Sequence, residues 1–126
     1  MARLYYTPDR GDLVHVNLSP SAGHELTGPD YALVLSPKTY NRPTGMAICV
    51  GITSRIRGGP FEVQLPPGHL PEKAGVGKVE SVILADAIRQ LDFRERSMSF
   101  IAKCPLSVLD EVTMRSLSLI DPEADF

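Results

Sequence analysis

The chain has 126 residues, of which 43% are hydrophobic and 22% charged, with a formal net charge of −2 at pH 7. This length allows one domain with its own hydrophobic core, so we expect a single domain over residues 1–126. No apolar run approaches the ~18 residues of a membrane-spanning helix. The first twelve residues contain no apolar stretch typical of a secretory signal. We therefore expect a cytoplasmic protein without membrane contact.

The two cysteines, Cys49 and Cys104, form neither a CxxC motif nor a zinc site. Cys49 lies in an apolar segment, where a buried, inert thiol is expected rather than a nucleophile. The histidines are too scattered to suggest a ligand set: His15, His24 and His69. We expect no metal and no cofactor.

The first strand is predicted over Leu13–Leu18, after Gly11-Asp12. Alternation predicts two faces, with Val14, Val16 and Leu18 on the core face and Leu13, His15 and Asn17 on the other. His15 is then a half-exposed strand residue, and a catalytic role is the alternative. Residues 19–30 follow as a polar loop with two prolines and two glycines, which carries His24, Glu25 and Asp30. Loops this long are uncommon in compact domains unless they cover a site or are mobile.

Three strands are predicted in the middle of the chain: Tyr31–Ser36, Met46–Ile52 and Phe61–Leu65. Pro37 closes the first, and Met46–Ile52 is too short for a typical helix and too apolar for a loop. Lys38–Thr44 contains turn formers and predicts a turn.

The last third begins with an irregular, proline- and glycine-rich segment, residues 66–78, followed by a predicted strand over Val79–Ala85. Asp86 and the segment Ala87–Leu91 come next, with Ile88 and Leu91 expected to be buried. Asp92–Lys103 is ambiguous between a short helix and a connecting turn. The clearest helix is Pro105–Ile120, whose expected apolar stripe is Leu106, Leu109, Val112, Leu117 and Ile120. A strand-rich barrel with a C-terminal helix is the simplest architecture.

Two hydroxyls and two guanidiniums follow directly after Met46–Ile52, on Thr53, Ser54, Arg55 and Arg57. Hydroxyls and backbone N–H groups can hold a phosphate, and guanidinium offers it bidentate donors. The alternative is a solvated loop that happens to be basic. Because the net charge is negative, affinity for nucleic acid requires a local patch. Its candidates are Lys38, Arg42, Arg55, Arg57, Lys73, Lys78 and Arg89, interleaved with Tyr31, Tyr40 and Phe61.

Several short motifs occur in order between Asp9 and Leu91: GDLVHVNLSP, GHELTG, ALVLSP, YN, TGM, CVGITS, GGPFEV and VILAD. Together they resemble the MazF/PemK (Kid-like) toxins of bacterial toxin–antitoxin operons. The resemblance implies a mainly β fold, an SH3-like small β-barrel with a C-terminal α-helix, which forms a homodimer. It implies a metal-independent endoribonuclease that cleaves single-stranded mRNA to 2′,3′-cyclic phosphate and 5′-OH ends. The implied partner is an antitoxin whose disordered acidic tail folds into the RNA groove.

The resemblance also assigns roles to individual residues. Thr53 matches the threonine whose hydroxyl contacts the scissile phosphate, and Ser54 is a second donor. Glu25 matches an acidic residue of the loop that folds over the RNA groove, where it could act as a base. Each has a structural alternative, as a threonine that ends a strand or a solvated carboxylate. The candidate RNA-binding residues are Ser54, His24, Lys38, Arg42, Tyr31 and Arg89.

The sequence departs from the family at one position. The family places an arginine, followed by proline, just before the ALVLSP strand, and here Asp30 stands in that place. An anion there would repel the phosphate. Three interpretations remain open: Arg55 or Arg57 supplies the cation, Asp30 and Glu25 form an acid–base pair, or the protein is a weak or inactive member that still binds RNA or its antitoxin. A non-enzymatic toxin with the same barrel, resembling the gyrase poison CcdB, is an alternative from a different class.

Overall fold

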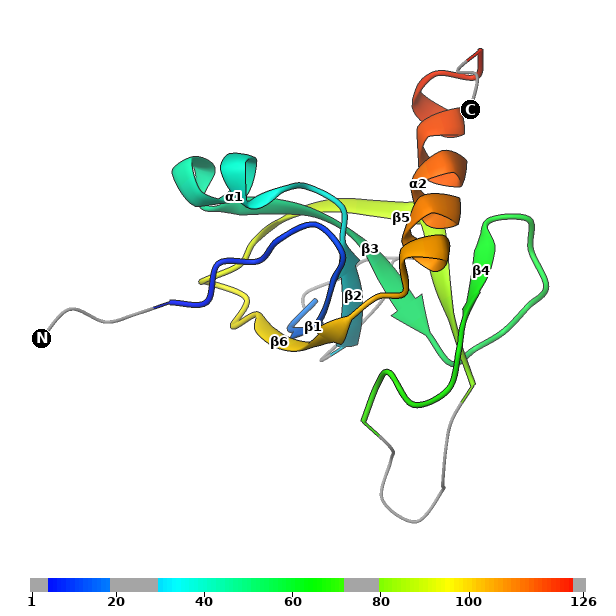
Figure 1. Ribbon diagram of the computed structural model, residues 1–126, viewed down its shortest axis with the longest axis horizontal. Coiled ribbons are helices and arrows are strands. Elements are labelled where there is room, and N and C mark those ends of the chain that lie inside the picture. The colour runs from blue at the N-terminus through cyan, green and yellow to red at the C-terminus, as the bar shows by residue number, and fades with distance from the viewer. Residues whose placement is uncertain (1–4, 19–29, 72–79, 124–126) are drawn as a thin grey trace, which may run out of the picture.

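The computed structural model describes residues 5–18, 30–71 and 80–123. Within these residues, six strands form one curled antiparallel sheet in the order β4-β5-β3-β2-β1-β6, and two helices pack on it (Figure 1). The elements are β1 (Asp12–Val16), β2 (Asp30–Val34), α1 (Lys38–Thr44), β3 (Met46–Thr53), β4 (Glu62–Leu65), β5 (Ser81–Asp92), β6 (Ser99–Lys103) and α2 (Leu106–Ile120). The mainly β barrel with a C-terminal helix is therefore confirmed.

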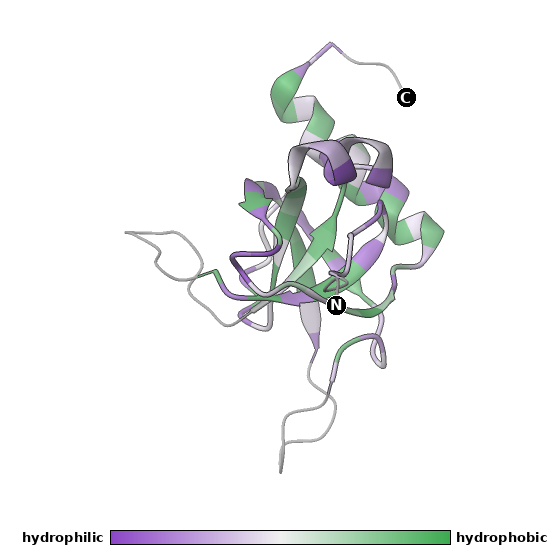
Figure 2. Ribbon diagram, turned by 90° about the vertical axis from the view of Figure 1, so that its left-hand side faces the viewer, coloured by the Kyte–Doolittle hydropathy of each residue, from purple (hydrophilic) through white to green (hydrophobic). Residues whose placement is uncertain are grey.

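The four central strands, β5, β3, β2 and β1, contribute side chains to two separate cores, one on each face of the sheet. Leu33 and Val50 pack with Val112 of α2 on one face. Val14 and Val34 pack on the other face with residues of the 93–98 turn, where the curled sheet covers itself. Figure 2 shows the resulting hydrophobic colour along these strands, and alternating colours along α2. The strand pattern thus arises from burial on both sides.

This double burial corrects the prediction for the first strand. Val14, Val16 and Leu18 are buried as expected, and His15 is half-buried. Leu13, expected on a non-core face, is also 0% exposed. It packs in the same cluster as Leu109 and Val112 of α2, so the prediction of a single core face was wrong.

The segment predicted as a turn, Lys38–Thr44, is the short helix α1. It ends at Gly45, whose positive φ of 70° lets its N–H bond to the carbonyl of Asn41, a common helix termination. Asn41 anchors the helix, because its fully buried side chain donates to the carbonyls of Pro8 and Ser36 at 2.8 and 3.0 Å. Local turn propensity is therefore overridden by tertiary hydrogen bonds, which a sequence pattern does not reveal.

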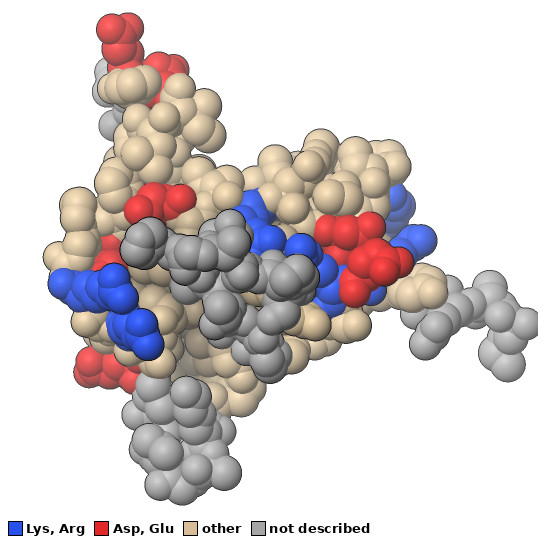
Figure 3. Space-filling view, turned by 180° about the vertical axis from the view of Figure 1, so that it is seen from behind, with Lys and Arg blue, Asp and Glu red and all other residues tan. Residues whose placement is uncertain are grey.

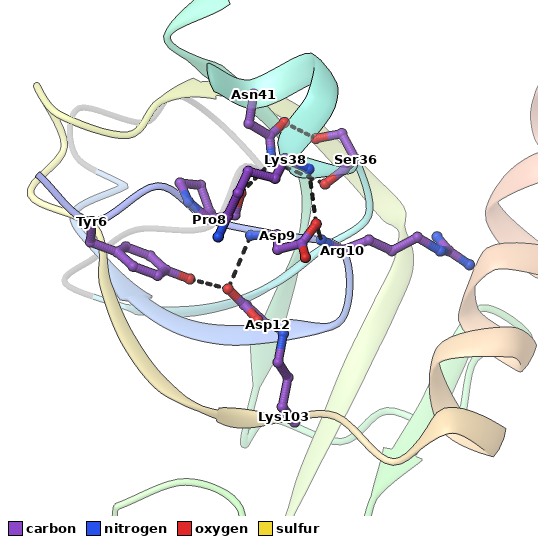
Figure 4. A network of polar contacts seen from close by, with 9 residues as sticks. All are labelled: Tyr6, Pro8, Asp9, Arg10, Asp12, Ser36, Lys38, Asn41 and Lys103. Carbon is purple, nitrogen blue, oxygen red and sulfur yellow. Dashed lines mark hydrogen bonds and ion pairs between the residues drawn. The ribbon is translucent and has the colours of Figure 1, made fainter. Parts of the chain in front are cut away.

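A buried carboxylate fastens the segment before β1 to the barrel (Figure 4). Asp12 is 3% exposed, accepts hydrogen bonds from the Tyr6 hydroxyl and the backbone N–H of Asp9, and forms an ion pair with Lys103 of β6. Burial, followed by the hydrogen bond to Asp12, raises the pKa of Tyr6. The buried charge is thus fully partnered, as stability requires.

The later strands differ from the prediction in two ways. The segments around Asp86 form one long strand, β5, whose register against β3 shifts between Val50 and Ile52. Asp92–Lys103, expected as a helix or turn, contains a turn and then β6, which pairs with β1. β6 is an edge strand with little burial, so its sequence lacks the apolar alternation that would have predicted it.

Helix α2 lies where expected and packs against β5 and β4, but its predicted stripe is only partly correct. Leu109 and Val112 are buried, whereas Leu106 and Ile120 are each 71% exposed. Figure 1 shows the reason for Ile120, since the far end of α2 projects beyond the sheet. Neither helix in the described ranges is long and apolar enough to span a membrane.

Candidate functional site

Thr53, the residue with the strongest predicted role, is the last residue of β3 and pairs with Val82 of β5. Its side chain is half-buried rather than turned into the core. Its Oγ1 accepts a hydrogen bond of 3.1 Å from the backbone N–H of Arg55. Among the described residues the Thr53 O–H has no acceptor of its own, so its hydrogen is available to a ligand oxygen.

Asp30 is brought to the same end of the sheet by strand register. It is the first residue of β2 and pairs with Val16, while its neighbour Tyr31 pairs with Ile52. Continuing this antiparallel register by one residue brings the backbone of Asp30 opposite Thr53. Asp30, which stands where the resemblance implies an arginine, therefore adjoins Thr53 in the sheet.

The loop between β3 and β4 exposes both candidate cations. Ser54, Arg55, Ile56 and Arg57 are all exposed, and Ile56 retains 47% of its accessible surface. Both ion pairs in the described part of the chain involve other residues, so neither guanidinium is neutralised by a described carboxylate. Figure 3 shows separate groups of basic side chains on one face, and the group at its left lies over this loop. The arginines can therefore take an oxyanion.

Two charged side chains that sequence reasoning missed hold this loop. Glu62, the first residue of β4, accepts hydrogen bonds from the backbone N–H groups of Arg57 and Gly58. Arg115 of α2 donates to the carbonyl of Pro60 and forms an ion pair with Glu111. The Glu111–Arg115 pair has the (i, i+4) spacing that a sequence can reveal. Its contact with the loop has no such signal.

The other candidates are distributed around the barrel. Tyr31 contacts His15 edge-on, with ring centroids 5.5 Å apart, and Arg89 reaches the carbonyl of Leu18 at 3.4 Å. Leu18 is the last described residue before the segment 19–29, which carries His24 and Glu25. Those two residues, with Lys73 and Lys78, lie outside the described residues. The structure does not bring together Lys38 and Arg42 with Thr53.

Lys38 and Arg42 lie on α1, at the opposite end of β3 from Thr53 (Figure 1). β3 has eight residues, which at ~3.3 Å per residue separates its ends by about 23 Å. Tyr40 is on the same helix and its hydroxyl accepts from Gln90 at 2.6 Å. Phe61, by contrast, is the last residue of the β3–β4 loop and packs against the core cluster that includes Leu109 and Val112 of α2. Tyr31 pairs with Ile52, the neighbour of Thr53, and Phe61 ends the loop that follows Thr53. Both are therefore nearer to Thr53 than Tyr40 is.

The thiols are poor candidates for chemistry. Cys49 is 1% exposed, and burial raises its pKa to about 12. Burial likewise raises the pKa of Cys104 to about 11. A thiol must ionise to act as a nucleophile or metal ligand, so the expected inert character of Cys49 agrees with its surroundings.

Comparison with known proteins identifies the family. Residues 9–119 match the family model described as "PemK-like, MazF-like toxin of type II toxin-antitoxin system". The chain belongs to this family. The resemblance noted in the sequence is therefore confirmed, and the matched region spans most of this PemK/MazF-like toxin.

Individual relatives agree with this family. The chain is 42% identical over 91 residues to the endoribonuclease toxin MazF of Escherichia coli (strain K12), which covers 72% of this chain and 74% of the relative. Among solved structures, MazF from Deinococcus radiodurans has a TM-score of 0.79 and 46% identity, covering 92% of this chain and 98% of that chain. A MazE–MazF structure from the same organism has a TM-score of 0.73 and 42% identity, with coverage of 92% and 98%. The fold and its family are thus established together.

Proposed function

We propose that this PemK/MazF-like toxin is an endoribonuclease that cuts single-stranded mRNA at the end of β3. Its family membership and its relatives, which are named endoribonucleases, support the activity. The observation that carries the site is the half-buried Thr53, whose hydroxyl accepts from Arg55 N–H at 3.1 Å. Thr53 directly precedes the loop that carries two guanidiniums without a described carboxylate partner. A neutral donor and cations meeting at one strand end are suited to a phosphate.

The proposed reaction uses the RNA itself as the nucleophile. The 2′-OH attacks the neighbouring phosphorus, a base accepts its proton, and the P–O bond to the 5′-oxygen breaks as that oxygen is protonated. The products are a 2′,3′-cyclic phosphate and a 5′-OH, and no metal is required for this step. Thr53 and Ser54 would donate to the phosphate oxygens, and Arg55 and Arg57 would neutralise the growing charge.

The aspartate at position 30 makes the source of the cation the critical question. Because the backbone of Asp30 adjoins Thr53, a carboxylate near the phosphate has to be compensated for by a nearby cation. We favour Arg55 and Arg57, which leave the same strand end as Thr53. Glu25 would act as the base. A weak or inactive toxin that only binds RNA or its antitoxin is the second interpretation, and an acid–base pair of Glu25 and Asp30 is the third.

Recognition of a single strand fits the side chains available around the barrel. Unstacked RNA bases can stack on aromatic rings, and Tyr31, in edge contact with His15, is the candidate on β2. Arg89, which contacts the carbonyl of Leu18, and His24 would contact the RNA next to the cut. Lys38 and Arg42 on α1 would contact only a strand long enough to reach the far end of β3. We place this activity in the cytoplasm, where mRNA is available.

Two protein partners are proposed. The MazE–MazF structures of Deinococcus radiodurans support an antitoxin of this type as one partner. A second copy of the chain is the other, and the exposed apolar side chains of α2 support an interface there: Leu106, Met114, Leu119 and Ile120. Light scattering of the purified toxin tests the dimer, and we expect a mass twice that of one chain.

Primer extension on a long RNA tests the nuclease, using wild type, Thr53→Ala and Arg57→Ala in EDTA. We expect sharp stops with wild type that weaken or disappear with both variants. Stops that persist with Thr53→Ala would contradict the proposed site. An RNA left intact by wild type, with inhibition of DNA gyrase instead, would support the CcdB-like alternative.

A further inference from the structure

The loop that carries Arg55 and Arg57 is held at both of its sides by charged side chains from other elements. Residues 54–61 connect β3 to β4, and they are mostly exposed. Exposed loops are ordinarily the most mobile parts of a domain. Here, however, the loop is fixed by Glu62 on β4 and by Arg115 on α2, which we call the loop clamp.

Glu62 binds the loop through its backbone. Its Oε2 accepts from the N–H of Arg57 at 3.0 Å, and its Oε1 accepts from the N–H of Gly58 at 2.8 Å. Both oxygens are therefore engaged by two successive amides, in a turn where Gly58 has a positive φ of 79°. The carboxylate fixes the backbone position of Arg57. It does not contact the Arg57 guanidinium, which stays available for an anion.

Arg115 holds the other end of the loop from the helix. Its Nη1 donates to the carbonyl of Pro60 at 2.6 Å and to the carbonyl of Glu62 at 3.3 Å. Its Nη2 contacts Glu111 Oε1 at 2.5 Å, one helical turn earlier. The guanidinium fork thus spans three acceptors, a geometry that lysine cannot reproduce.

We propose that Glu62 and Arg115 are positioning residues for the phosphate site, which act on RNA only through the loop that they hold. This inference rests on the proposed nuclease function. A loop already fixed in the free protein loses little freedom when RNA binds, and its cations stand where the charge develops. Displacement of reacting groups by about 1 Å can cost ~10²-fold in rate, so the clamp has a measurable share in catalysis.

The test combines cleavage with a measurement that does not depend on it. Glu62→Ala and Arg115→Ala are each expected to lower kcat/KM on a single-stranded RNA by about 10- to 100-fold. Glu62→Gln and Arg115→Lys keep part of the contacts and should recover part of the rate. Matched controls are Glu95→Ala and Arg94→Ala, both exposed in the 93–98 turn and outside the site.

A double-mutant cycle separates positioning from general destabilisation. In an Arg55→Ala/Arg57→Ala background, Glu62→Ala should change kcat/KM by less than about 2-fold, since residues that act together are not additive. Amide hydrogen exchange should accelerate at Arg57 and Gly58 in Glu62→Ala, while the thermal midpoint stays close to that of wild type. An equal loss of rate in both backgrounds, or unchanged exchange at these two amides, would overturn the clamp.

Failure of the clamp can be told apart from failure of the nuclease. If wild type cuts RNA and the Glu62 and Arg115 variants cut it equally well, the positioning role is wrong and the nuclease stands. If wild type leaves RNA intact, the proposed function is wrong. The catalytic role of the clamp then falls with it, whatever the amide exchange shows.

Discussion

The hydroxyl oxygen of Thr53 accepts a hydrogen bond of 3.1 Å from the backbone N–H of Arg55. This bond ties the residue best suited to contact a phosphate to one of the residues that can neutralise it. It also orients the hydroxyl, because an oxygen that accepts on one side presents its hydrogen elsewhere. The strand end and the first turn of the loop therefore form one local unit.

The cation that offsets Asp30 is expected to come from the loop. We predict that Arg55→Ala/Arg57→Ala lowers the single-turnover rate of RNA cleavage by about 10²- to 10³-fold, because strong electrostatic donors to the transition state are lost. Arg94→Ala is the matched control, since its guanidinium lies 4.7 Å from the Tyr5 ring, outside the site. The rate is measured with a fluorogenic single-stranded RNA.

Asp30→Arg completes this test. In the background that lacks both loop arginines, it should restore part of the lost rate by putting a guanidinium next to Thr53. If the double alanine variant cuts as fast as wild type, the cation lies elsewhere. If wild type is inactive and Asp30→Arg alone creates activity, the interpretation as an inactive member is correct.

The side chain of Asn41 is expected to be the main anchor of α1. It is 0% exposed, donates to the carbonyls of Pro8 and Ser36, and accepts from the Ser36 hydroxyl at 2.6 Å. Asn41→Ala leaves these buried groups unpaired, so we predict a loss of about 2–4 kcal/mol in the free energy of unfolding. Urea denaturation measures this loss.

Thr39→Ala, exposed on the same helix, is the control and should change the free energy of unfolding by less than about 0.5 kcal/mol. A similar small change in Asn41→Ala would mean that α1 is held by other contacts. The segment would then be a helix for reasons of its own sequence.

Both thiols are expected to resist alkylation in the folded protein. Burial raises the pKa of Cys49 to about 12 and that of Cys104 to about 11, so at pH 8 only ~10⁻⁴ and ~10⁻³ of each would be thiolate. Mass spectrometry after iodoacetamide treatment should find the native protein unmodified and the urea-unfolded protein modified twice. Rapid native labelling of Cys49 would show that the β3 core opens.

Asp9 is predicted to make stability depend on acid pH. The backbone N–H of Lys38, at 2.8 Å, is the main cause that lowers the pKa of Asp9 below 3.8, and the N–H of Arg10 adds to it. The folded state thus releases the proton more readily than the unfolded state. The stabilisation is fully present above 3.8 and is lost as the pH falls through the lower folded pKa.

Thermal midpoints of wild type and Asp9→Asn, measured from pH 5 downwards to below 3.8, check this expectation. Asp9→Asn should flatten the acid decline. Asp110→Asn, on the exposed side of α2, controls for the loss of one negative charge. An identical decline in wild type and Asp9→Asn would show that other carboxylates govern acid stability.

The parts of the fold that could be predicted are the segments in which burial produces a local pattern of apolar residues. Met46–Ile52 became β3 and Pro105–Ile120 became α2 because their apolar side chains meet a core. β6 escaped prediction because an edge strand buries few side chains. The helix α1 escaped it because Asn41 obtains its partners from residues up to 33 positions away.

The same distinction applies to the site. Thr53, Ser54, Arg55 and Arg57 are adjacent in the sequence, so their proximity could be predicted from the strand that precedes them. The approach of Asp30 to Thr53 depends on strand register, which the chain pattern does not specify at that end. The contact of Arg115 with Pro60 joins residues 55 positions apart and becomes visible only when α2 is packed on the sheet.

The measurement that tests the account most directly is a comparison of wild type, Thr53→Ser and Thr53→Ala on one cleavable RNA oligonucleotide in EDTA, with mass analysis of the new ends. We expect wild type to yield a 2′,3′-cyclic phosphate and a 5′-OH, Thr53→Ser to keep most of the rate, and Thr53→Ala to lose about 10²- to 10³-fold. Thr39→Ala should match wild type. A Thr53→Ala variant that produces the same ends at the wild-type rate would contradict a phosphate site at the end of β3.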